Sequence, residues 1–323
     1  MSGRDLFQPY ADACFASIDR KRAVSAQPKP RQNRLLAALP PEDYERLLPY
    51  LEPVSLPVGG TVHGASDRQK HLYFPTSGMV SRFYVMQNGA SARLAVTGSE
   101  GVIGVALLLG GESMPAQAVV LSAGYAYRLE AGLLKDELKK DGPLLHLLLR
   151  YTMALIVQTA QVAVCSRHHS LEQQLCRWLL LSLDRLPGNE LAMTQERISN
   201  ILGVRREGVT EAAGRLQKAG LIHYSRGHIA VLDRPRLEAH ACECYAVVKR
   251  EYDRLLPPEN TIGNAGVHAT EVHDSCSISG NQSPWPSVTP VAGVPVSVRT
   301  PAINARERFV ADDARARSRA ALA

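Results

Sequence analysis

Residues 194–232 read TQERISNILGVRREGVTEAAGRLQKAGLIHYSRGHIAVL, and this stretch decides the fold of the C-terminal half of the chain. Thr194 can cap a short helix by accepting a hydrogen bond from the backbone N–H of Arg197. Gly203 can adopt the positive φ that ends this helix, and a second amphipathic helix then opens at about Arg205. A short helix, a glycine turn and an amphipathic helix in this order predict a helix-turn-helix.

Two short strands are expected after the second helix, over residues 221–232, with a turn at Arg226-Gly227. Gly220 closes the helix that precedes them. Strands with a basic turn at this place form the wing of a winged helix-turn-helix. Residues 194–236 contain eight Arg and Lys against four Asp and Glu, so the positive charge of the chain is concentrated on this segment.

The second helix presents Arg206 and Thr210 on one outward stripe, with Glu207 and Glu211 one residue along. A recognition helix contacts base edges with its N-terminal residues, where arginine pairs with guanine and glutamate accepts from the cytosine amino group. The pattern predicts a DNA-binding surface, and the alternative is an ordinary charged face in solvent. The residues expected to contact DNA are Thr194, Gln195, Arg205, Arg206, Glu207, Thr210, Glu211 and Arg226.

Short apolar stretches alternate with glycine-rich breaks over residues 54–129. Regular short strands with turn signals predict an antiparallel β-barrel or sandwich. The sharpest hairpin signal is Asn88-Gly89.

A long helix is expected from Leu144 to about His169, because helical spacing begins after Gly142-Pro143. Positions spaced alternately three and four apart resemble a coiled-coil seam, which predicts pairing with a second copy of the chain. The alternative is a helix that faces the core of a monomer. The seam consists of Leu145, Leu148, Thr152, Leu155, Thr159, Val162 and Ser166.

The composition is that of a soluble globular protein, with 45% hydrophobic and 21% charged residues among 323. We expect no apolar run with a length near the roughly 18 residues that a membrane-spanning helix needs. The charged N-terminus does not resemble a signal peptide. We therefore expect a cytoplasmic protein without membrane contact. Its six cysteines are too few and too scattered for a disulfide framework and are interpreted as reduced thiols.

The run from Thr194 to Ile222 resembles the DNA-binding segment of the Crp/Fnr family without a gap, and the hairpins before the long helix resemble that family's cyclic-nucleotide-binding-type β-roll. The resemblance covers about residues 33–254. It implies a homodimer that reads a two-fold symmetric DNA operator and cooperates with RNA polymerase. It also implies base contacts for Arg206 and Glu207. An Arg that the family often places where Glu211 stands is missing, which puts a standard family operator in doubt.

These observations predict an α+β fold with an N-terminal antiparallel β-roll, a long dimerisation helix and a C-terminal winged helix-turn-helix. The expected boundaries are a flexible leader over 1–32, a β-roll sensor domain over 33–142, the dimerisation helix over 143–169, the DNA-binding domain over 170–256, and a disordered tail over 257–323.

The effector pocket is expected at Gly104, Val105, Gly110 and Gly111. In the cyclic-AMP-binding members that the chain resembles, a Glu follows the first glycine and an Arg holds the cyclic phosphate. Here Val105 follows Gly104, and no Lys or Arg occurs over residues 94–127. A buried phosphate needs a cationic partner, so the sequence argues against cyclic AMP. Only Cys14 precedes residue 165, which also argues against an iron-sulfur cluster.

No cofactor or metal site is predicted. Cys165 beside His168-His169, and Cys242-x-Cys244 beside His240, have metal or redox chemistry as one interpretation, but packing and surface roles are preferred. No nucleophile elbow, phosphate loop or zinc-protease motif occurs, so an enzyme is not expected. The competing hypothesis is an effector-sensing or protein-interaction module that has lost specific DNA binding.

Overall fold

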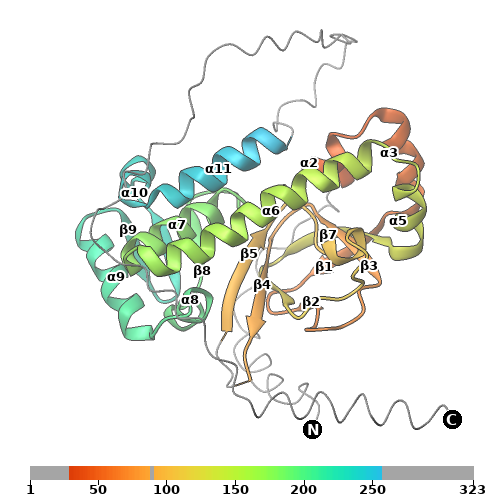
Figure 1. The fold of residues 1–323 in the computed structure, drawn as a ribbon. Coiled ribbons are helices and arrows are strands. Elements are labelled where there is room, and N and C mark those ends of the chain that lie inside the picture. Colours follow the sequence, from red (N-terminus) through yellow and green to blue (C-terminus); the bar gives the residue numbers. More distant parts are fainter. Residues whose placement is uncertain (1–28, 88–90, 257–323) are drawn as a thin grey trace, which may run out of the picture. The chain divides into compact units, whose positions relative to one another are not determined.

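The fold is described by a computed structural model that covers residues 29–87 and 91–256 (Figure 1). The expected leader up to residue 28, the turn at Asn88-Gly89 and the expected tail from residue 257 lie outside the described residues. The helices are η1 (Pro30–Gln32), α2 (Arg34–Ala37), α3 (Pro41–Leu47), η2 (Leu48–Tyr50), α4 (Val105–Leu108), α5 (Ala131–Leu138), α6 (Pro143–His168), α7 (Leu171–Leu183), α8 (Gln195–Leu202), α9 (Arg206–Lys218), α10 (Arg234–His240) and α11 (Glu243–Leu255). The strands are β1 (Glu52–Leu56), β2 (Thr61–His63), β3 (His71–Pro75), β4 (Met79–Val85), β5 (Ser91–Thr97), β6 (Gln117–Ser122), β7 (Gly124–Glu130), β8 (Glu190–Ala192), β9 (Ile222–Ser225) and β10 (His228–Val231).

The N-terminal half is a β-roll of two antiparallel sheets, with strand orders β1-β7-β3 and β2-β6-β4-β5. Apolar side chains that alternate along the strands, such as Val80 and Val120, fill the space inside the roll. Buried Asn33 caps α2, and its amide donates to the carbonyls of Pro75 and Gly101, each at 2.9 Å. The α+β class and the order of β-roll, long helix and winged helix-turn-helix are confirmed.

The long helix α6 packs against β5 on one side and α11 on another (Figure 1). Buried Gln158 joins the three elements, because its Oε1 accepts from the backbone N–H of Val96 at 2.7 Å and its Nε2 donates to the Tyr252 hydroxyl at 2.8 Å. A buried amide with both ends paired stabilises one particular packing arrangement. The helix is therefore an integral part of the described fold.

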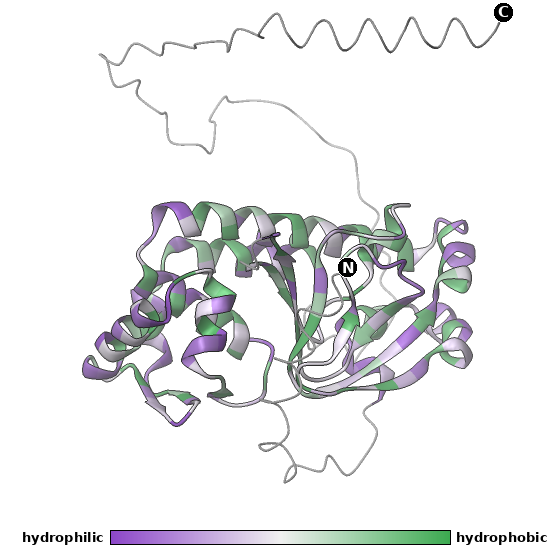
Figure 2. Cartoon of the chain, turned by 90° about the horizontal axis from the view of Figure 1, so that it is seen from below, coloured by the Kyte–Doolittle hydropathy of each residue, from purple (hydrophilic) through white to green (hydrophobic). Residues whose placement is uncertain are grey.

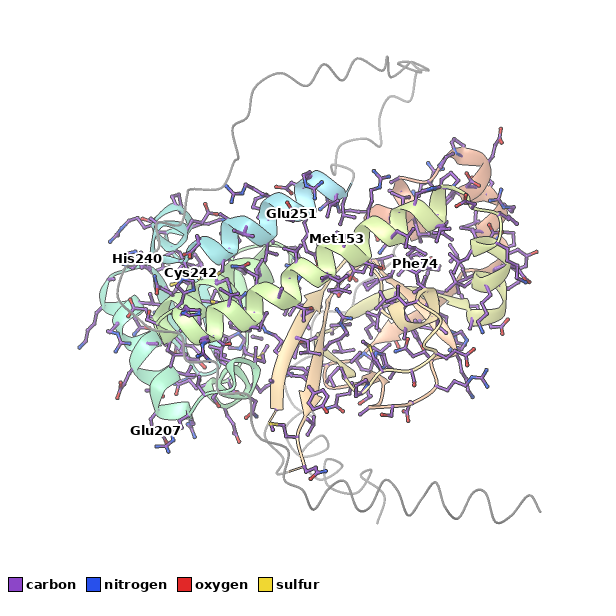
Figure 3. The ribbon with its side chains drawn as sticks, in the orientation of Figure 1. Phe74, Met153, Glu207, His240, Cys242 and Glu251 are labelled. Carbon is purple, nitrogen blue, oxygen red and sulfur yellow. The ribbon has the colours of Figure 1, made fainter. Side chains whose placement is uncertain are left out.

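Three of the seven residues of the predicted seam of α6, Leu148, Thr152 and Leu155, are buried within the chain itself and cannot pair with a second copy. Of the other four, Leu145, Thr159 and Val162 are half-buried and Ser166 is exposed. The face turned away from the rest of the chain instead exposes Leu149, Met153, Ile156 and Val164 (Figure 3 labels Met153). Apolar residues lie on both the buried and the exposed face of α6, so spacing alone does not reveal which face is the core. Figure 2 shows the hydropathy of each residue along the ribbon, with hydrophobic residues in green.

The expectation that no apolar run has the length of a membrane span is also wrong. Helix α6 is long and apolar enough to cross a membrane, and 39% of its most apolar 18-residue window is buried in the fold. The core helix of a soluble protein meets the same criterion. The paired buried amide of Gln158 and the packing on β5 and α11 favour that interpretation here.

The C-terminal half is a winged helix-turn-helix. Helices α7, α8 and α9 pack together, and the wing is a three-stranded antiparallel sheet with the order β8-β10-β9. Arg226 and Gly227 have φ values of 48° and 79°, so they form a two-residue hairpin turn with both central residues in the left-handed region. This is the turn that the sequence predicts.

Candidate nucleic-acid interface and neighbouring sites

The helix-turn-helix begins and ends where the sequence predicts. The Thr194 hydroxyl accepts from the backbone N–H of Arg197 at 3.3 Å and caps α8. Gly203 ends α8 with a φ of 69°, and α9 begins at Arg206. Buried Ile198 and Val209 belong to the core that holds the two helices together.

The hydrogen bond from the Thr210 hydroxyl to Gln195 Oε1, at 2.8 Å, joins the starts of α8 and α9. Two of the residues expected to contact DNA therefore position each other. The C-terminal end of α9 is anchored to α7, because Arg215 Nε donates to Glu172 Oε2 at 2.6 Å. Gly208 also lies close to α7, and a Cβ there would lie 2.9 Å from a methyl group of Leu171, which would have to move. The recognition helix is thus fixed at both ends.

All eight residues expected to contact DNA lie on one region made by α8, the start of α9 and the tip of the wing. Gln195 is half-buried and the other seven are exposed. Glu207 projects at the edge of the molecule in Figure 3. Arg206, Glu207 and Arg226 form no salt bridge with any other residue within 29–87 or 91–256, so their charges are available to a partner.

The wing is fixed to the residues that precede α8. The backbone N–H of Met193 donates to Gly227 at 2.7 Å, and the Tyr224 hydroxyl donates to the Met193 carbonyl at 3.0 Å. Burial raises the pKa of Tyr224 to about 12 despite the lowering effect of the Arg206 charge, so the hydroxyl keeps its proton at neutral pH. These contacts place the tip of the wing next to Thr194.

The expected effector loop has few free donors. Gly104, with a φ of 114°, precedes α4, and Val105 is buried in the core at the position where a ribose-binding Glu would stand. The backbone N–H groups of Gly111 and Glu112 both donate to the Ala106 carbonyl. The Glu112 carboxylate, at the end of this loop, forms salt bridges with Arg68 and Lys135.

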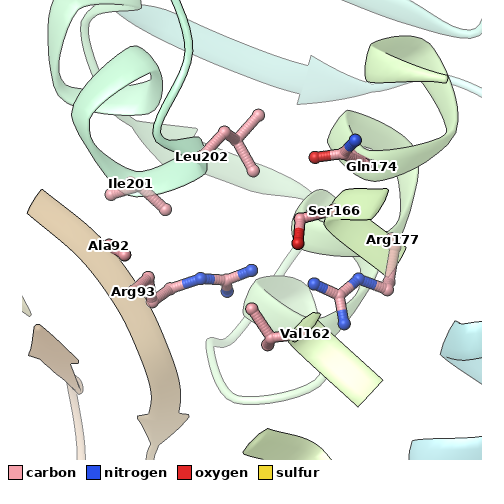
Figure 4. Close-up of a pocket in the computed structure, with 8 residues that line it drawn as sticks. All are labelled: Ala92, Arg93, Val162, Ser166, Gln174, Arg177, Ile201 and Leu202. Atoms are coloured by element: carbon pink, nitrogen blue, oxygen red, sulfur yellow. The ribbon is translucent and has the colours of Figure 1, made fainter. Parts of the chain in front are cut away.

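A small cavity of about 80 Å³ lies between β5, α6, α7 and α8 (Figure 4). Arg93 and Arg177 direct their guanidinium groups into it from opposite sides, and both side chains are buried. Arg93 Nε and two nitrogens of Arg177 have no hydrogen-bond partner among the described residues. Burial, assisted by the charge of Arg177, lowers the pKa of Arg93. Two desolvated cations that form no salt bridge with a described residue are costly to the fold.

One buried ion pair connects the β-roll to the DNA-binding half. Arg185, just after α7, donates from Nε to Glu100 Oε1 at 2.7 Å, and the two side chains are only 5% and 9% exposed. The other carboxylate oxygen of Glu100 accepts from the backbone N–H of Gly98 at 3.0 Å. Burial lowers the pKa of Arg185, but the charge of Glu100 outweighs burial and the pKa is raised overall.

Four potential metal ligands that the sequence analysis did not select as a site also meet in the structure: Cys165, His169, Cys242 and Cys244. The neighbouring His168 and His240 are not members of this group. The sequence does contain a signal for this group, because Cys165 and His169 lie one helical turn apart and Cys242 and Cys244 are separated by one residue. These two pairs lie more than 70 residues apart, however, and nothing local in the sequence indicates that they meet.

Comparison with known protein families agrees with this architecture. Residues 173–240 match the Crp-like helix-turn-helix domain, and residues 53–141 match the cyclic nucleotide-binding domain. The chain belongs to the Crp/Fnr family of transcription regulators. Its members are DNA-binding regulators and not enzymes, so the expectation of a non-enzymatic regulator is confirmed.

Solved structures share the fold at low sequence identity. A Crp/Fnr-family transcriptional regulator from Eubacterium rectale is 20% identical with a TM-score of 0.54, covering 65% of this chain and 98% of that one. FixK2 from Bradyrhizobium japonicum is 17% identical with a TM-score of 0.51, covering 59% of this chain and 98% of that one. No protein of curated function matches the sequence.

Proposed function

We propose that this Crp/Fnr regulator acts in the cytoplasm as a homodimer that binds a two-fold symmetric operator and controls transcription by RNA polymerase. The main supporting observation is the exposed start of α9, where Arg206 and Glu207 project without salt bridges to other described residues. Arg226 is likewise exposed, at the tip of the wing. An Arg and a Glu at the N-terminus of a recognition helix can read a G·C pair in the major groove.

The other expected contacts fit phosphate binding. Thr194, Gln195 and Arg205 lie at the helix starts, where backbone N–H groups and a positive dipole end favour phosphate. Arg226 lies at the wing tip, where it can reach an adjacent phosphate or the minor groove. Glu211 follows Glu207 by one turn on the same helix, so this stripe is more acidic than that of the family members it resembles.

Arg206→Ala should weaken binding to the cognate operator by about 1 to 3 kcal/mol and change binding to random duplex little. The reason is that a bidentate contact to guanine contributes to discrimination between bases more than to general affinity. Fluorescence anisotropy on operator and random duplexes measures both quantities. Lys218→Ala, at the far end of α9, is the matched control and should affect the two duplexes alike.

An equal loss on both duplexes would reassign Arg206 to a phosphate contact. Binding that shows no salt dependence on either duplex would instead favour the protein-interaction module, because phosphate neutralisation always gives a steep salt slope.

The outward stripe of α6 supports the dimer. Leu149, Met153, Ile156 and Val164 are each 46–57% exposed and follow one another at helical spacing. A two-fold axis beside this helix would pair the stripe with its own copy, since such an interface uses the same surface on both subunits. The proposed seam therefore moves from Leu148 and its neighbours to this face.

The loop after Gly104 supports the proposal that cyclic AMP is not the effector of this protein. Val105 offers no ribose contact, and the amides of Gly111 and Glu112 already donate to the backbone. The two cations beside this loop, Arg68 and Lys135, are already paired with the Glu112 carboxylate. The cavity between Arg93 and Arg177 has suitable charge, but about 80 Å³ is far below the roughly 300 Å³ that pockets for larger ligands need.

Millimolar cyclic AMP should leave both the melting temperature and the operator affinity of the full chain unchanged. A ligand that binds only the folded state at a hundred times its Kd adds about 2.7 kcal/mol, which a melting experiment detects easily. A cyclic-AMP-binding family member, measured alongside, provides the positive control. A saturable rise in either quantity would contradict this proposal and indicate a phosphate site near Gly110.

A further inference from the structure

Three cysteines and one histidine from distant parts of the sequence meet where α6 ends and α11 begins, close to the labelled Cys242 in Figure 3. Cys165 lies in the last turn of α6, and His169 directly follows that helix. Cys242 directly precedes α11, and Cys244 lies in its first turn. One potential ligand atom from each of the four residues lies within 4.8 Å of all the others.

We propose that these four side chains bind one zinc ion in a tetrahedral Cys3His site. Zinc–sulfur bonds of about 2.3 Å and zinc–nitrogen bonds of about 2.0 Å place neighbouring donors of a tetrahedron roughly 3.5 to 3.8 Å apart. Cys165 Sγ lies 3.5 Å from Cys242 Sγ, and Cys244 Sγ lies 3.4 Å from His169 Nδ1. The donors are therefore already close to the separations that zinc requires.

The groups around the four ligands also fit a metal site. His169 Nε2 lies 3.2 Å from a carboxylate oxygen of Glu243, which leaves Nδ1 directed at the sulfur atoms. Zinc-bound histidines commonly donate their second N–H to a carboxylate in this way, and the contact fixes the tautomer. Gln161 Nε2 donates to Cys244 Sγ at 3.0 Å, a bond that stabilises a thiolate.

Burial indicates a structural site without an open position for a substrate. Cys165, Cys242 and Cys244 are at most 4% exposed, and closed four-ligand sites of this kind are structural. Cys242 and Cys244 lie at the N-terminal end of α11, where the positive end of the helix dipole faces the sulfur atoms. Cys176, buried in α7, lies outside the group, and burial raises its pKa to about 12.

Zinc at this place would tie the end of the long helix to the start of α11. His169 belongs to the short connection between α6 and α7, so the metal would also fix the angle at which the DNA-binding half leaves that helix. The site is independent of the operator and effector proposals above. It predicts a metal requirement for a stable junction whatever DNA sequence the protein recognises.

The test uses the full chain purified under reducing conditions without chelator. Elemental analysis should find one zinc per chain, and exchange for Co²⁺ should give the absorption of tetrahedral cobalt with thiolate charge-transfer bands. His169→Gln and Cys242→Ser should lose the metal, whereas Cys176→Ser should keep it and is the matched control. Glu243→Gln, at an exposed side chain, should keep the fold and lower zinc affinity by about 10- to 100-fold.

Two results would overturn the proposal. One is folded wild-type protein that holds no zinc after exposure to the ion and gives no cobalt spectrum. The other is a Cys165–Cys242 disulfide, found by peptide mapping of that protein, which would make the cluster a redox pair. Because both are measured on the wild type, the proposal can be tested even if a cysteine variant fails to fold.

Discussion

We expect the double variant Leu149→Lys, Ile156→Lys to be a folded monomer with an operator affinity about 10²- to 10⁴-fold below that of the wild type. Both side chains are exposed in the single chain, so lysine there costs little within one subunit. In a dimer the same positions would bring like charges together in a dry interface, which is strongly unfavourable. The monomer then binds one half-site at a time and loses the effective concentration that links two.

Light scattering at micromolar concentration measures the assembly, and anisotropy measures the operator affinity. Leu109→Lys, at an exposed leucine outside α6, is the matched control and should remain a dimer. Leu148→Lys tests the register, because this neighbouring side chain is fully buried and lysine there should unfold the chain. A wild-type monomer, or a dimeric double variant, would contradict the proposed interface.

The second large effect is expected at the buried ion pair. Glu100→Gln should lower the free energy of unfolding by about 3 to 5 kcal/mol, because it leaves the Arg185 cation buried without its counter-charge. Glu172→Gln removes one partner of the exposed Arg215 pair and should cost about 0 to 1 kcal/mol. Urea unfolding of the two variants measures the difference.

Addition of Arg185→Met to Glu100→Gln should recover much of the loss, since an apolar side chain replaces the uncompensated cation. A loss below about 1 kcal/mol for Glu100→Gln would mean that water reaches Arg185 and that the pair does not join the two halves as described.

The winged helix-turn-helix was predictable because its signals are local. The Thr194 cap, the positive φ of Gly203 and the turn at Arg226-Gly227 each depend on a few adjacent residues, and the structure has all three. The third strand of the wing, β8, was not predicted. It has only three residues and exists because it pairs with β10, which no local pattern indicates.

The register of α6 and the two buried sites depend on tertiary packing. Leu148 and Leu149 are chemically identical neighbours, and only the packing of α6 against the rest of the described fold determines which of them is buried. Arginine is rarely fully buried, so no sequence rule would place Arg93 and Arg177 in one cavity. Cys165 and Cys242 become neighbours only when α11 folds back along α6.

Selection of bound duplexes from a random pool by the full chain tests the central claim most directly. A homodimer with one recognition helix per subunit should enrich a two-fold symmetric pair of half-sites whose centres lie about 10 base pairs, or one helical turn, apart. A pool without an enriched sequence, or with a single unpaired half-site, would contradict the proposal of a dimeric, sequence-specific operator-binding regulator.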